Sequence, residues 1–151
     1  MAKALYMLLI RIDSSIQVRI RGASYNLQPG YYLYIGSGGG PGGVHARLRR
    51  HLIKEKSIHW HIDQITTNTD AHIIKVWICN SLWGPYMESR VALCLEKHLD
   101  HGPPGFGSSD DRHAKTHLFA IGIDLSSLEP ILRECCQDLL EEYDIDEYLG
   151  E

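Results

Sequence analysis

Three tyrosines and three arginines lie close together in this sequence, on either side of a glycine-rich segment. The segment is GSGGGPGG at residues 36–43, and the flanking residues are Tyr31, Tyr32, Tyr34, Arg47, Arg49 and Arg50. Arginine binds phosphate with bidentate geometry, and a phenolate can take a proton from water. These residue types therefore suit phosphodiester chemistry. A structural explanation fits as well, because tyrosine is common in strands and a basic helix face is often only solvated.

A strand and a helix must position these side chains. Residues 30–37, GYYLYIGS, form a strand in which alternation puts Tyr32 and Tyr34 on one face. An apolar residue at every fourth position from Val44 to Leu52 predicts an amphipathic helix with the arginines between them. The glycines end the strand and form the loop between the two elements. The arginines can therefore face the same surface as the two phenols.

The rest of the chain predicts four more strands and two or three more helices. We expect strands at 3–12, 16–20, 72–79 and 117–124, a helix or turn at 58–65, and helices at 86–101 and 126–143. The turn at 13–15 predicts that the first two strands form a hairpin. Ser126 and Glu129 have the spacing of a capping box. This pattern predicts an α+β fold with a small mixed or antiparallel sheet flanked by helices, formed by residues 1–125, with an acidic C-terminal helix and tail at 126–151 packed on the same domain.

Charge is unevenly distributed along the chain. The 151 residues are 44% hydrophobic and 23% charged, which indicates one globular domain, and the net charge of −4 argues against a general nucleic-acid binder. Residues 1–56, however, hold nine Lys or Arg and two acidic residues, a net charge of +7, and the remainder carries −11. A polyanionic partner is therefore compatible with the sequence. We predict that the acidic segment 139–151 lies across or near the basic face and weakens non-specific binding.

Neither a targeting segment nor a membrane segment is expected. The apolar run at 4–10 is short and reads as a buried strand. Cys79, Cys94, Cys135 and Cys136 form no CxxC pair, and two of them are adjacent. An adjacent pair does not easily close a disulfide framework, so we expect reduced thiols and a cytoplasmic protein.

Several short motifs resemble those of the GIY-YIG nuclease superfamily. Residues 34–36 are the YIG half of its signature, and residues 4–6, ALY, resemble the GIY half with alanine in place of the first glycine. Arg47, in HARLRRHL, matches the arginine on the next helix. The chain is most similar to a family of small GIY-YIG-like proteins, because GYYLYIGS, RHL, WHID, FGSSD and HLF follow in the same order from about Ala4 to Phe119.

This resemblance implies a divalent-metal-dependent endonuclease that hydrolyses phosphodiester bonds in DNA. Tyr6 or Tyr34 would be the general base that takes a proton from water, and Arg47 would hold the scissile phosphate. We expect the nucleic acid to be contacted by Arg49, Arg50, His51, Ser37 and Tyr32.

A glutamate on a later helix would carry Mg²⁺ or Mn²⁺ in such an enzyme, and two residues compete for this role. At 100° per residue, Glu88 lies at the centre of an apolar stripe, whereas Glu96 lies about 80° away. A carboxylate that faces the core is costly unless it is paired or bound to metal, so we favour Glu88. Glu96 stays the alternative, because VALCLE resembles the Ala-Leu-x-x-Glu pattern of several superfamily members. Either glutamate could instead pair with an arginine.

Two departures from the superfamily favour an alternative function. No asparagine follows Asn80, although many members carry one soon after the glutamate helix, and the first motif lacks its glycine. The 28 residues from Tyr6 to Tyr34 also leave room for an extra strand. The alternative is a non-catalytic nucleic-acid-binding module with the same fold.

Histidines and aspartates suggest a third function, a metallohydrolase with a zinc or manganese site. The candidates are His45, His51, His59, His61, Asp63, Asp110, Asp111, His113 and His117. Their spacing matches no strong zinc pattern, so we rank this function last. We expect WHID and FGSSD to shape the rim around the tyrosine and arginine surface.

Overall fold

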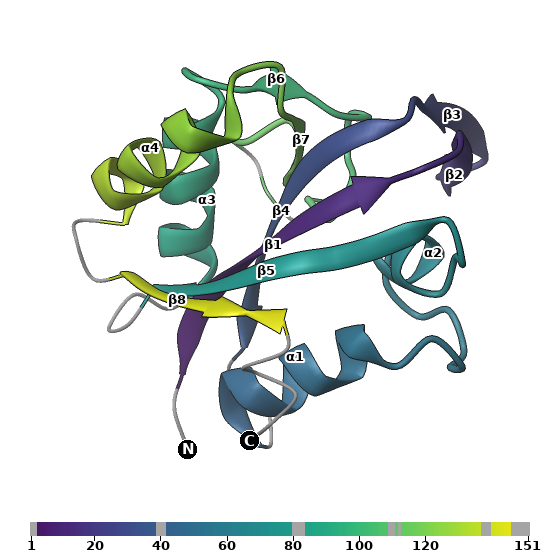
Figure 1. The fold of residues 1–151 in the computed structure, drawn as a ribbon, viewed down its shortest axis with the longest axis horizontal. Helices are drawn as coiled ribbons and strands as arrows, with labels where there is room; N and C mark the ends of the chain where they lie inside the picture. Colours follow the sequence, from purple (N-terminus) through teal and green to yellow (C-terminus); the bar gives the residue numbers. More distant parts are fainter. Residues whose placement is uncertain are drawn as a thin grey trace.

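The computed structural model describes residues 3–38, 42–79, 84–108, 111, 113–136 and 140–145 (Figure 1). Its main sheet has six antiparallel strands in the order β6-β7-β4-β1-β5-β8, and β2 pairs only with β3. The strands are β1 (Ala4–Ile12), β2 (Ile16–Ile20), β3 (Ala23–Leu27), β4 (Gly30–Gly38), β5 (Ala71–Cys79), β6 (Asp100–His101), β7 (Leu118–Ala120) and β8 (Leu140–Asp144). The helices are α1 (Gly43–Leu52), α2 (Asp63–Thr66), α3 (Pro85–Leu95) and α4 (Leu128–Cys135), with a 3₁₀ turn, Leu125–Ser127, before α4. The predicted α+β class is confirmed.

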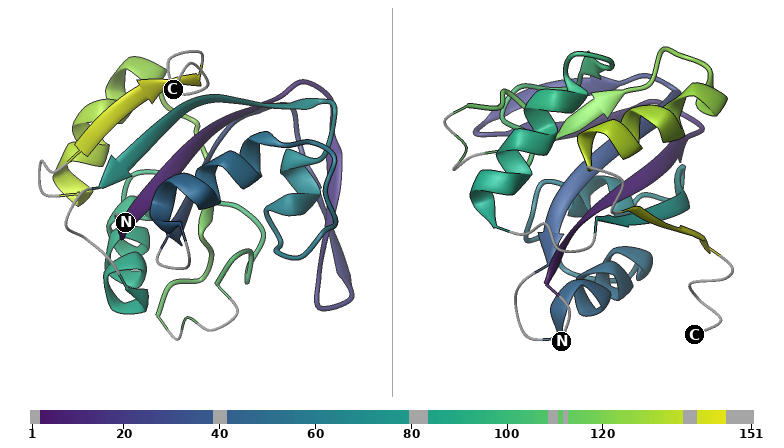
Figure 2. Two further views of the ribbon diagram at one scale, coloured as in Figure 1. Left: turned by 90° about the horizontal axis from the view of Figure 1, so that it is seen from below. Right: turned by 90° about the vertical axis from the view of Figure 1, so that its left-hand side faces the viewer.

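Helices cover both faces of the sheet (Figure 2). β1 is central and almost wholly buried, so its sequence is a nearly continuous apolar run. Tyr6 and Leu8 face the core formed with α1 and α2, whereas Leu5 and Met7 face the core formed with α3 and α4. A side chain on β1 can therefore contact α1 only if it lies on the same face of the sheet as Tyr6 and Leu8. The same holds for side chains on β4.

The two halves of the nuclease-like signature lie on neighbouring strands. β1 pairs with β4 so that Tyr6 lies opposite Gly36 and Leu8 lies opposite Tyr34. A Cβ atom at Gly36 would overlap the phenol of Tyr6. Glycine is therefore required at this position if the Tyr6 ring is to lie against the β4 backbone.

The predicted hairpin between the first two strands is wrong. β1 pairs with β4 and β5, while β2 pairs with β3 through a tight turn at Arg21 and Gly22, both of which have positive φ. β2 alternates buried and exposed residues and suits a small two-stranded sheet, whereas β1 is buried on both faces and needs a neighbour on each edge. Arg-Gly is not a common sequence for such a turn, so β3 was not expected.

The long C-terminal helix is also wrong. α4 ends at Cys135, and residues 140–144 form β8, which pairs with β5 at the sheet edge. Glu142 accepts a hydrogen bond from the Trp77 indole at 2.9 Å, and Glu142 and Asp144 both pair with Lys75. These contacts, together with the edge of β5, favour a strand. Residues 139 and 146–151 lie outside the described residues, so the predicted effect of the acidic segment on binding stays a prediction.

Two other elements are shorter than predicted. α3 ends at Leu95 instead of continuing to residue 101, because residues 100–101 pair with β7 as β6. The strand expected at 117–124 is confined to Leu118–Ala120.

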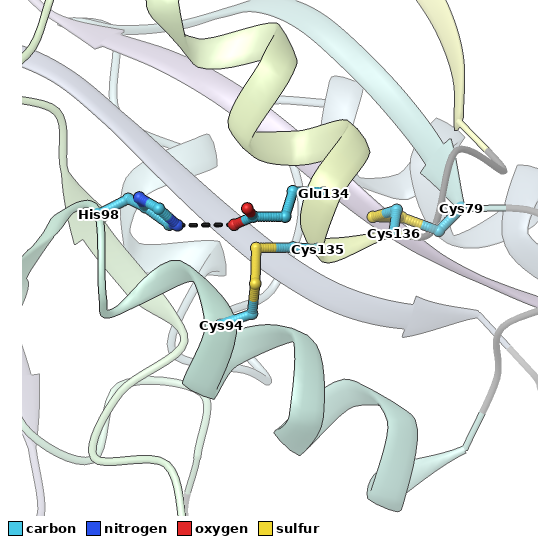
Figure 3. Close-up of a disulfide and its surroundings, with 6 residues drawn as sticks. All are labelled: Cys79, Cys94, His98, Glu134, Cys135 and Cys136. Carbon is cyan, nitrogen blue, oxygen red and sulfur yellow. Dashed lines mark hydrogen bonds and ion pairs between the residues drawn. A yellow bond between two sulfur atoms is a disulfide. The ribbon is translucent and has the colours of Figure 1, made fainter.

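The four cysteines form two disulfide bonds, so the expectation of free thiols is wrong (Figure 3). Cys94 of α3 is bonded to Cys135, and Cys79 of β5 is bonded to Cys136, with Cα–Cα separations of 5.6 and 5.8 Å. Successive side chains on a helix point about 100° apart, which lets adjacent cysteines reach two different partners. No described helix is long and apolar enough to cross a membrane.

Candidate active site

An open cleft of about 660 Å³ lies beside the end of β4, between α1 and the first turn of α3. All four candidate catalytic residues line this cleft: Tyr6 from β1, Tyr34 from β4, Arg47 from α1 and Glu88 from α3. Ser37 and His51, which we expected to contact nucleic acid, line it as well. The structure therefore brings together residues that are 82 positions apart in the sequence, from Tyr6 to Glu88.

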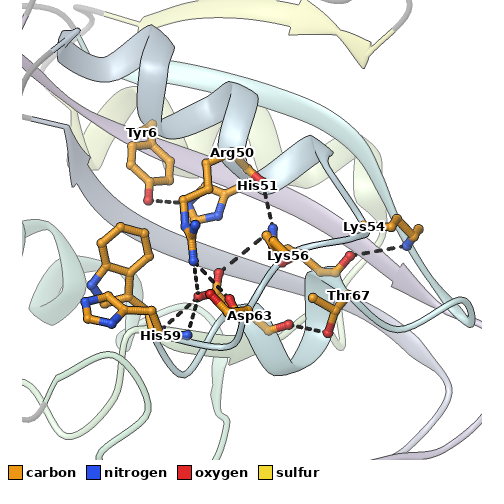
Figure 4. A network of polar contacts seen from close by, with 11 residues as sticks. Tyr6, Arg50, His51, Lys54, Lys56, His59, Asp63 and Thr67 are labelled. Carbon is orange, nitrogen blue, oxygen red and sulfur yellow. Dashed lines mark hydrogen bonds and ion pairs between the residues drawn. The ribbon is translucent and has the colours of Figure 1, made fainter.

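Tyr6 and His51 form a buried pair within the cleft wall. The Tyr6 Oη and His51 Nε2 atoms lie 2.6 Å apart (Figure 4), and both side chains are buried. Burial raises the pKa of the Tyr6 phenol, although the charge and hydrogen bond of Arg47 lower it in part. Burial lowers the pKa of His51 to about 3, and the positive charges of Lys56, Arg47 and Arg50 lower it further. His51 is therefore neutral at neutral pH, and one hydrogen bond joins its Nε2 to the phenol.

Tyr34 lies next to this pair and is fixed by aromatic contacts. Its ring centroid is 6.2 Å from His51 and 6.1 Å from Phe106, edge to face in both cases. Burial raises the pKa of Tyr34 well above its ordinary value. Gly107 has a φ of +68°, and a Cβ there would lie 3.1 Å from Tyr34 Cε1, so glycine lets the loop after Phe106 pack against the tyrosine.

The WHID segment holds the arginines of α1 in place. The Trp60 ring lies 4.3 Å from the Arg47 guanidinium and 4.8 Å from that of Arg50. Asp63 is fully buried and accepts hydrogen bonds at 2.9 Å from Arg50 and from the backbone N–H groups of His59 and Trp60 (Figure 4). Burial alone would raise the pKa of Asp63, but these hydrogen bonds outweigh it and the pKa is lowered. Arg50 is thus committed to Asp63, and Arg47 is the arginine that lines the cleft.

Glu88 is held by residues of the loop that leads to β7. Glu88 Oε1 lies 3.2 Å from His117 Nδ1, and His117 Nε2 lies 2.9 Å from Asp111 Oδ2. Asp111 Oδ1 also accepts hydrogen bonds from the Ser89 hydroxyl and from the backbone N–H groups of His113 and Ala114. Burial alone would lower the pKa of His117, but its contacts with the two carboxylates outweigh burial and the pKa is raised.

Four candidate residues lie away from the cleft. Glu96 pairs with His101 at 3.0 Å at the opposite end of α3, and the Tyr32 hydroxyl donates to the Gln28 carbonyl at 2.6 Å. Arg49 is exposed on α1 and Arg50 pairs with Asp63. None of these four lines the cleft.

Among the described residues, no histidine belongs to a group of three possible ligands whose donor atoms all lie within 4.8 Å of one another. The group placed to share one ion is Cys94, Glu134 and Cys135, and both of its cysteines belong to a disulfide (Figure 3). His61 instead accepts a hydrogen bond at Nδ1 from the Gly107 backbone N–H at 2.9 Å, which joins the WHID and FGSSD segments. Both segments therefore form part of the cleft rim. Asp110 lies outside the described residues.

The chain matches the family DUF123, described as a domain of unknown function, over residues 5–141. It belongs to the DUF123 family. No curated protein and no solved structure gives a match. The DUF123 region includes every residue that lines the cleft.

The cleft of this DUF123 protein has one carboxylate suited to a divalent cation. The Asp111 carboxylate is occupied by four donors, whereas Glu88 is 19% exposed and, among the described residues, pairs with His117. Mg²⁺ is often bound through one or two carboxylates together with water and substrate phosphate oxygens. The residues present therefore fit a Mg²⁺ or Mn²⁺ ion at Glu88.

Sequence reasoning missed three features of this DUF123 site. It did not connect His117 and Asp111 with Glu88, because the two lie on an irregular loop without periodicity. It assigned His51 to nucleic-acid contact, although the four-residue spacing from Arg47 places both on one helix face. It also passed over Tyr86, which lines the cleft and is 71% exposed.

Proposed function

We propose that this DUF123 protein is a divalent-metal-dependent endonuclease that hydrolyses phosphodiester bonds in DNA. The observation that carries the proposal is the presence of Tyr6, Tyr34, Arg47 and Glu88 in one cleft, although they come from four elements. A phenol, a guanidinium and a carboxylate in one cleft supply a proton acceptor, a phosphate ligand and a metal ligand. The resemblance to GIY-YIG nucleases is the reason for naming DNA as the substrate.

Tyr6 is the general base in this proposal. Because its pKa is raised, the phenol is protonated at neutral pH and must lose that proton to act as a base. His51 Nε2, at 2.6 Å, is placed to receive it. A proton of the attacking water passes to Tyr6 Oη as the phenolic proton passes to His51, which gives it up to solvent because burial and the nearby cations disfavour the imidazolium. The water oxygen then bonds to phosphorus, the phosphorus–oxygen ester bond breaks, and the leaving oxygen takes a proton from solvent.

Arg47 holds the scissile phosphate. Its guanidinium stacks on Trp60, which restricts its orientation before substrate binds. A fixed positive charge beside the phosphate stabilises the charge that develops in the transition state. Its proximity to Tyr6 also stabilises the phenolate form of the general base.

Glu88 is the residue that would hold Mg²⁺ or Mn²⁺, and the ion would offset negative charge on the leaving oxygen. Glu96 cannot take this role in the same cleft, because it pairs with His101 at the opposite end of α3. We place the activity in the cytoplasm as part of the proposal. The two disulfides would then have to persist in a reducing compartment.

A cleavage assay with matched variants tests the proposal. Purified protein is incubated with end-labelled branched, flapped and single-stranded DNA in Mg²⁺, Mn²⁺ or EDTA. We expect metal-dependent cleavage by the wild type and by the control variants Arg49→Ala and Glu96→Gln, and its loss in Arg47→Ala and Glu88→Gln. The proposal is wrong if the wild type does not cleave any of these substrates, or if Arg47→Ala cleaves them equally well.

One observation favours a second function, a non-catalytic nucleic-acid-binding module. Burial raises the pKa of both Tyr6 and Tyr34, which opposes formation of a phenolate. The binding module predicts salt-dependent DNA or RNA binding that weakens when Arg47, Arg49 and Arg50 are replaced. It also predicts that Glu88→Gln binds normally and that no cleavage occurs with either metal.

A further inference from the structure

A chain of three side chains runs along the wall of the cleft to the proposed metal ligand. It starts at Asp111, passes through His117 and ends at Glu88, with contacts of 2.9 and 3.2 Å. We propose that His117, held by Asp111, is a positioning residue that fixes the Glu88 carboxylate for a divalent cation. This inference rests on the proposed function, because it assumes that Glu88 binds the metal.

His117 lines the cleft but is almost wholly buried, so it is placed to hold a neighbouring side chain in position. Its side chain is only 4% exposed, and each ring nitrogen faces a carboxylate oxygen. Its backbone N–H donates to the Phe106 carbonyl at 2.9 Å, and its carbonyl accepts from the Ile35 N–H of β4 at 3.0 Å. The imidazole therefore projects from a backbone that is tied to the sheet, its Nε2 is hydrogen-bonded to Asp111, and its Nδ1 lies at ion-pair distance from Glu88 without a hydrogen bond of its own.

Asp111 connects this histidine to the helix that carries Glu88. One of its oxygens accepts from the hydroxyl of Ser89, the residue next to Glu88 on α3, at 2.9 Å. The same oxygen accepts from two backbone N–H groups of the loop, at 2.8 and 3.0 Å. The loop is thus joined to α3 at two adjacent residues, once through Ser89 and once through His117 and Glu88.

This arrangement has a direct consequence for metal binding. A glutamate on the first turn of a helix can adopt several rotamers, and binding a cation requires one of them. His117 engages Oε1 and so restricts the carboxylate before the ion arrives. Partners that orient a metal ligand typically change metal affinity by about 10–100-fold when they are removed.

The test is a Mn²⁺ titration of the full chain without nucleic acid, followed by EPR and by paramagnetic broadening of the histidine ring signals in NMR. The variants are His117→Ala, Asp111→Asn and Glu88→Gln. The matched control is His101→Ala, because His101 forms a comparable pair with Glu96 on the other end of α3. Circular dichroism and thermal melting show which variants are folded, and Asp111→Asn provides a second probe if His117→Ala does not fold.

We expect about 10–100-fold weaker Mn²⁺ binding in His117→Ala and Asp111→Asn, loss of binding in Glu88→Gln, and wild-type binding in His101→Ala. We also expect high Mn²⁺ concentrations to restore part of the cleavage activity of His117→Ala, which a simple loss of fold would not allow. Wild-type Mn²⁺ affinity in both folded His117→Ala and Asp111→Asn would overturn this inference and leave the proposed function standing. Absence of Mn²⁺ binding in the wild type, or unchanged binding in Glu88→Gln, would overturn both the metal role of Glu88 and this inference.

Discussion

The cleft has two walls, one formed by α1 and the WHID segment and one formed by α3 and the loop before β7. In each wall an aspartate supports the local structure, but the residue that faces the cleft is positively charged in the α1 wall and negatively charged in the α3 wall. On the α1 side, buried Asp63 binds Arg50 and two backbone N–H groups, and Arg47 faces the cleft. On the α3 side, Asp111 binds His117 and two backbone N–H groups, and Glu88 faces the cleft. Each wall thus uses an aspartate that accepts hydrogen bonds from several donors to support a charged residue of the site. The first wall presents a cation suited to phosphate, and the second presents an anion suited to a metal ion.

The histidines of the two walls show how this difference affects protonation. His51 lies near Lys56, Arg47 and Arg50, and burial together with these charges lowers its pKa to about 3. His117 lies between two carboxylates, which raise its pKa despite burial. One histidine is therefore kept neutral by its surroundings, and the other holds its proton more firmly.

Removal of the α1 anchor should have the largest effect on stability. Asp63→Ala leaves Arg50 and Lys56 without their buried partner and frees two backbone N–H groups. We expect the free energy of unfolding to fall by about 3–5 kcal/mol, as measured by urea denaturation. Asp13→Ala is the control, because Asp13 pairs with Arg11 on the surface, where an ion pair contributes little to stability. A loss at Asp63 no larger than at Asp13 would show that this aspartate does not anchor the wall.

The stability of the α3 wall should depend on a disulfide bond. Among the described residues, the α1 wall has no such bond. Cys94 on α3 is bonded to Cys135 on α4, close to the His98–Glu134 pair (Figure 3). We expect the double variant Cys94→Ser/Cys135→Ser to lose about 2–4 kcal/mol of unfolding free energy. Thiol titration of the unfolded wild type before and after reduction provides the control. Four reactive thiols before reduction would contradict the assigned disulfides.

A third experiment tests the electrostatic difference between the two histidines. The unfolded imidazole takes up a proton near pH 6.5, whereas folded His51 does so only near pH 3, so stability falls as the pH drops through this interval. Between pH 7 and pH 5 the loss due to His51 should be about 2 kcal/mol. His117 contributes with the opposite sign, because its raised pKa favours the folded state at low pH.

The measurement is urea denaturation of wild type and His51→Asn at both pH values. His117 is present in both proteins, so the difference between their pH dependences isolates His51. We expect the variant to lose less stability than the wild type when the pH is lowered. Equal losses would mean that His51 is not held neutral by the fold.

The α1 wall could largely be predicted from the sequence, and the α3 wall could not. Strand alternation and helix periodicity placed Tyr34 and Arg47 on regular elements, where side-chain direction follows from spacing. Glu88 was favoured over Glu96 because it lies on the core-facing stripe of its helix, and the structure places it beside His117. The partners of Glu88 lie on a loop whose path depends on long-range contacts such as that between His61 and Gly107. Loop residues have no period from which their direction can be read.

The pairing of the strands was also only partly predictable from the sequence. The apolar run of β1 predicted a buried strand, but its partners β4 and β5 are separated from it by long stretches of chain. The nearest strand in sequence, β2, pairs elsewhere because its alternating pattern buries only one face. The strand β8 could not be foreseen either, because its acidic sequence depends on Lys75 and Trp77 of β5 for its polar contacts.

The smallest predicted effect concerns an exposed aromatic side chain at the rim of the cleft. Tyr86 is 71% exposed, lines the cleft two residues before Glu88, and lies 5.9 Å from the Arg90 guanidinium. If a nucleic acid occupies the cleft, an exposed ring at its edge can stack on an unpaired base. Tyr86→Ala should therefore weaken single-stranded DNA binding by about 1 kcal/mol, roughly fivefold in Kd, while Tyr86→Phe keeps the ring and binds like the wild type. Fluorescence anisotropy at constant salt measures the effect, and an equal loss in the two variants would point to the hydroxyl instead of the ring. Because Tyr86 belongs to α3 and Arg47 to α1, the comparison with Arg47→Ala in the same assay shows which of the two residues, and so which wall, contributes more to binding.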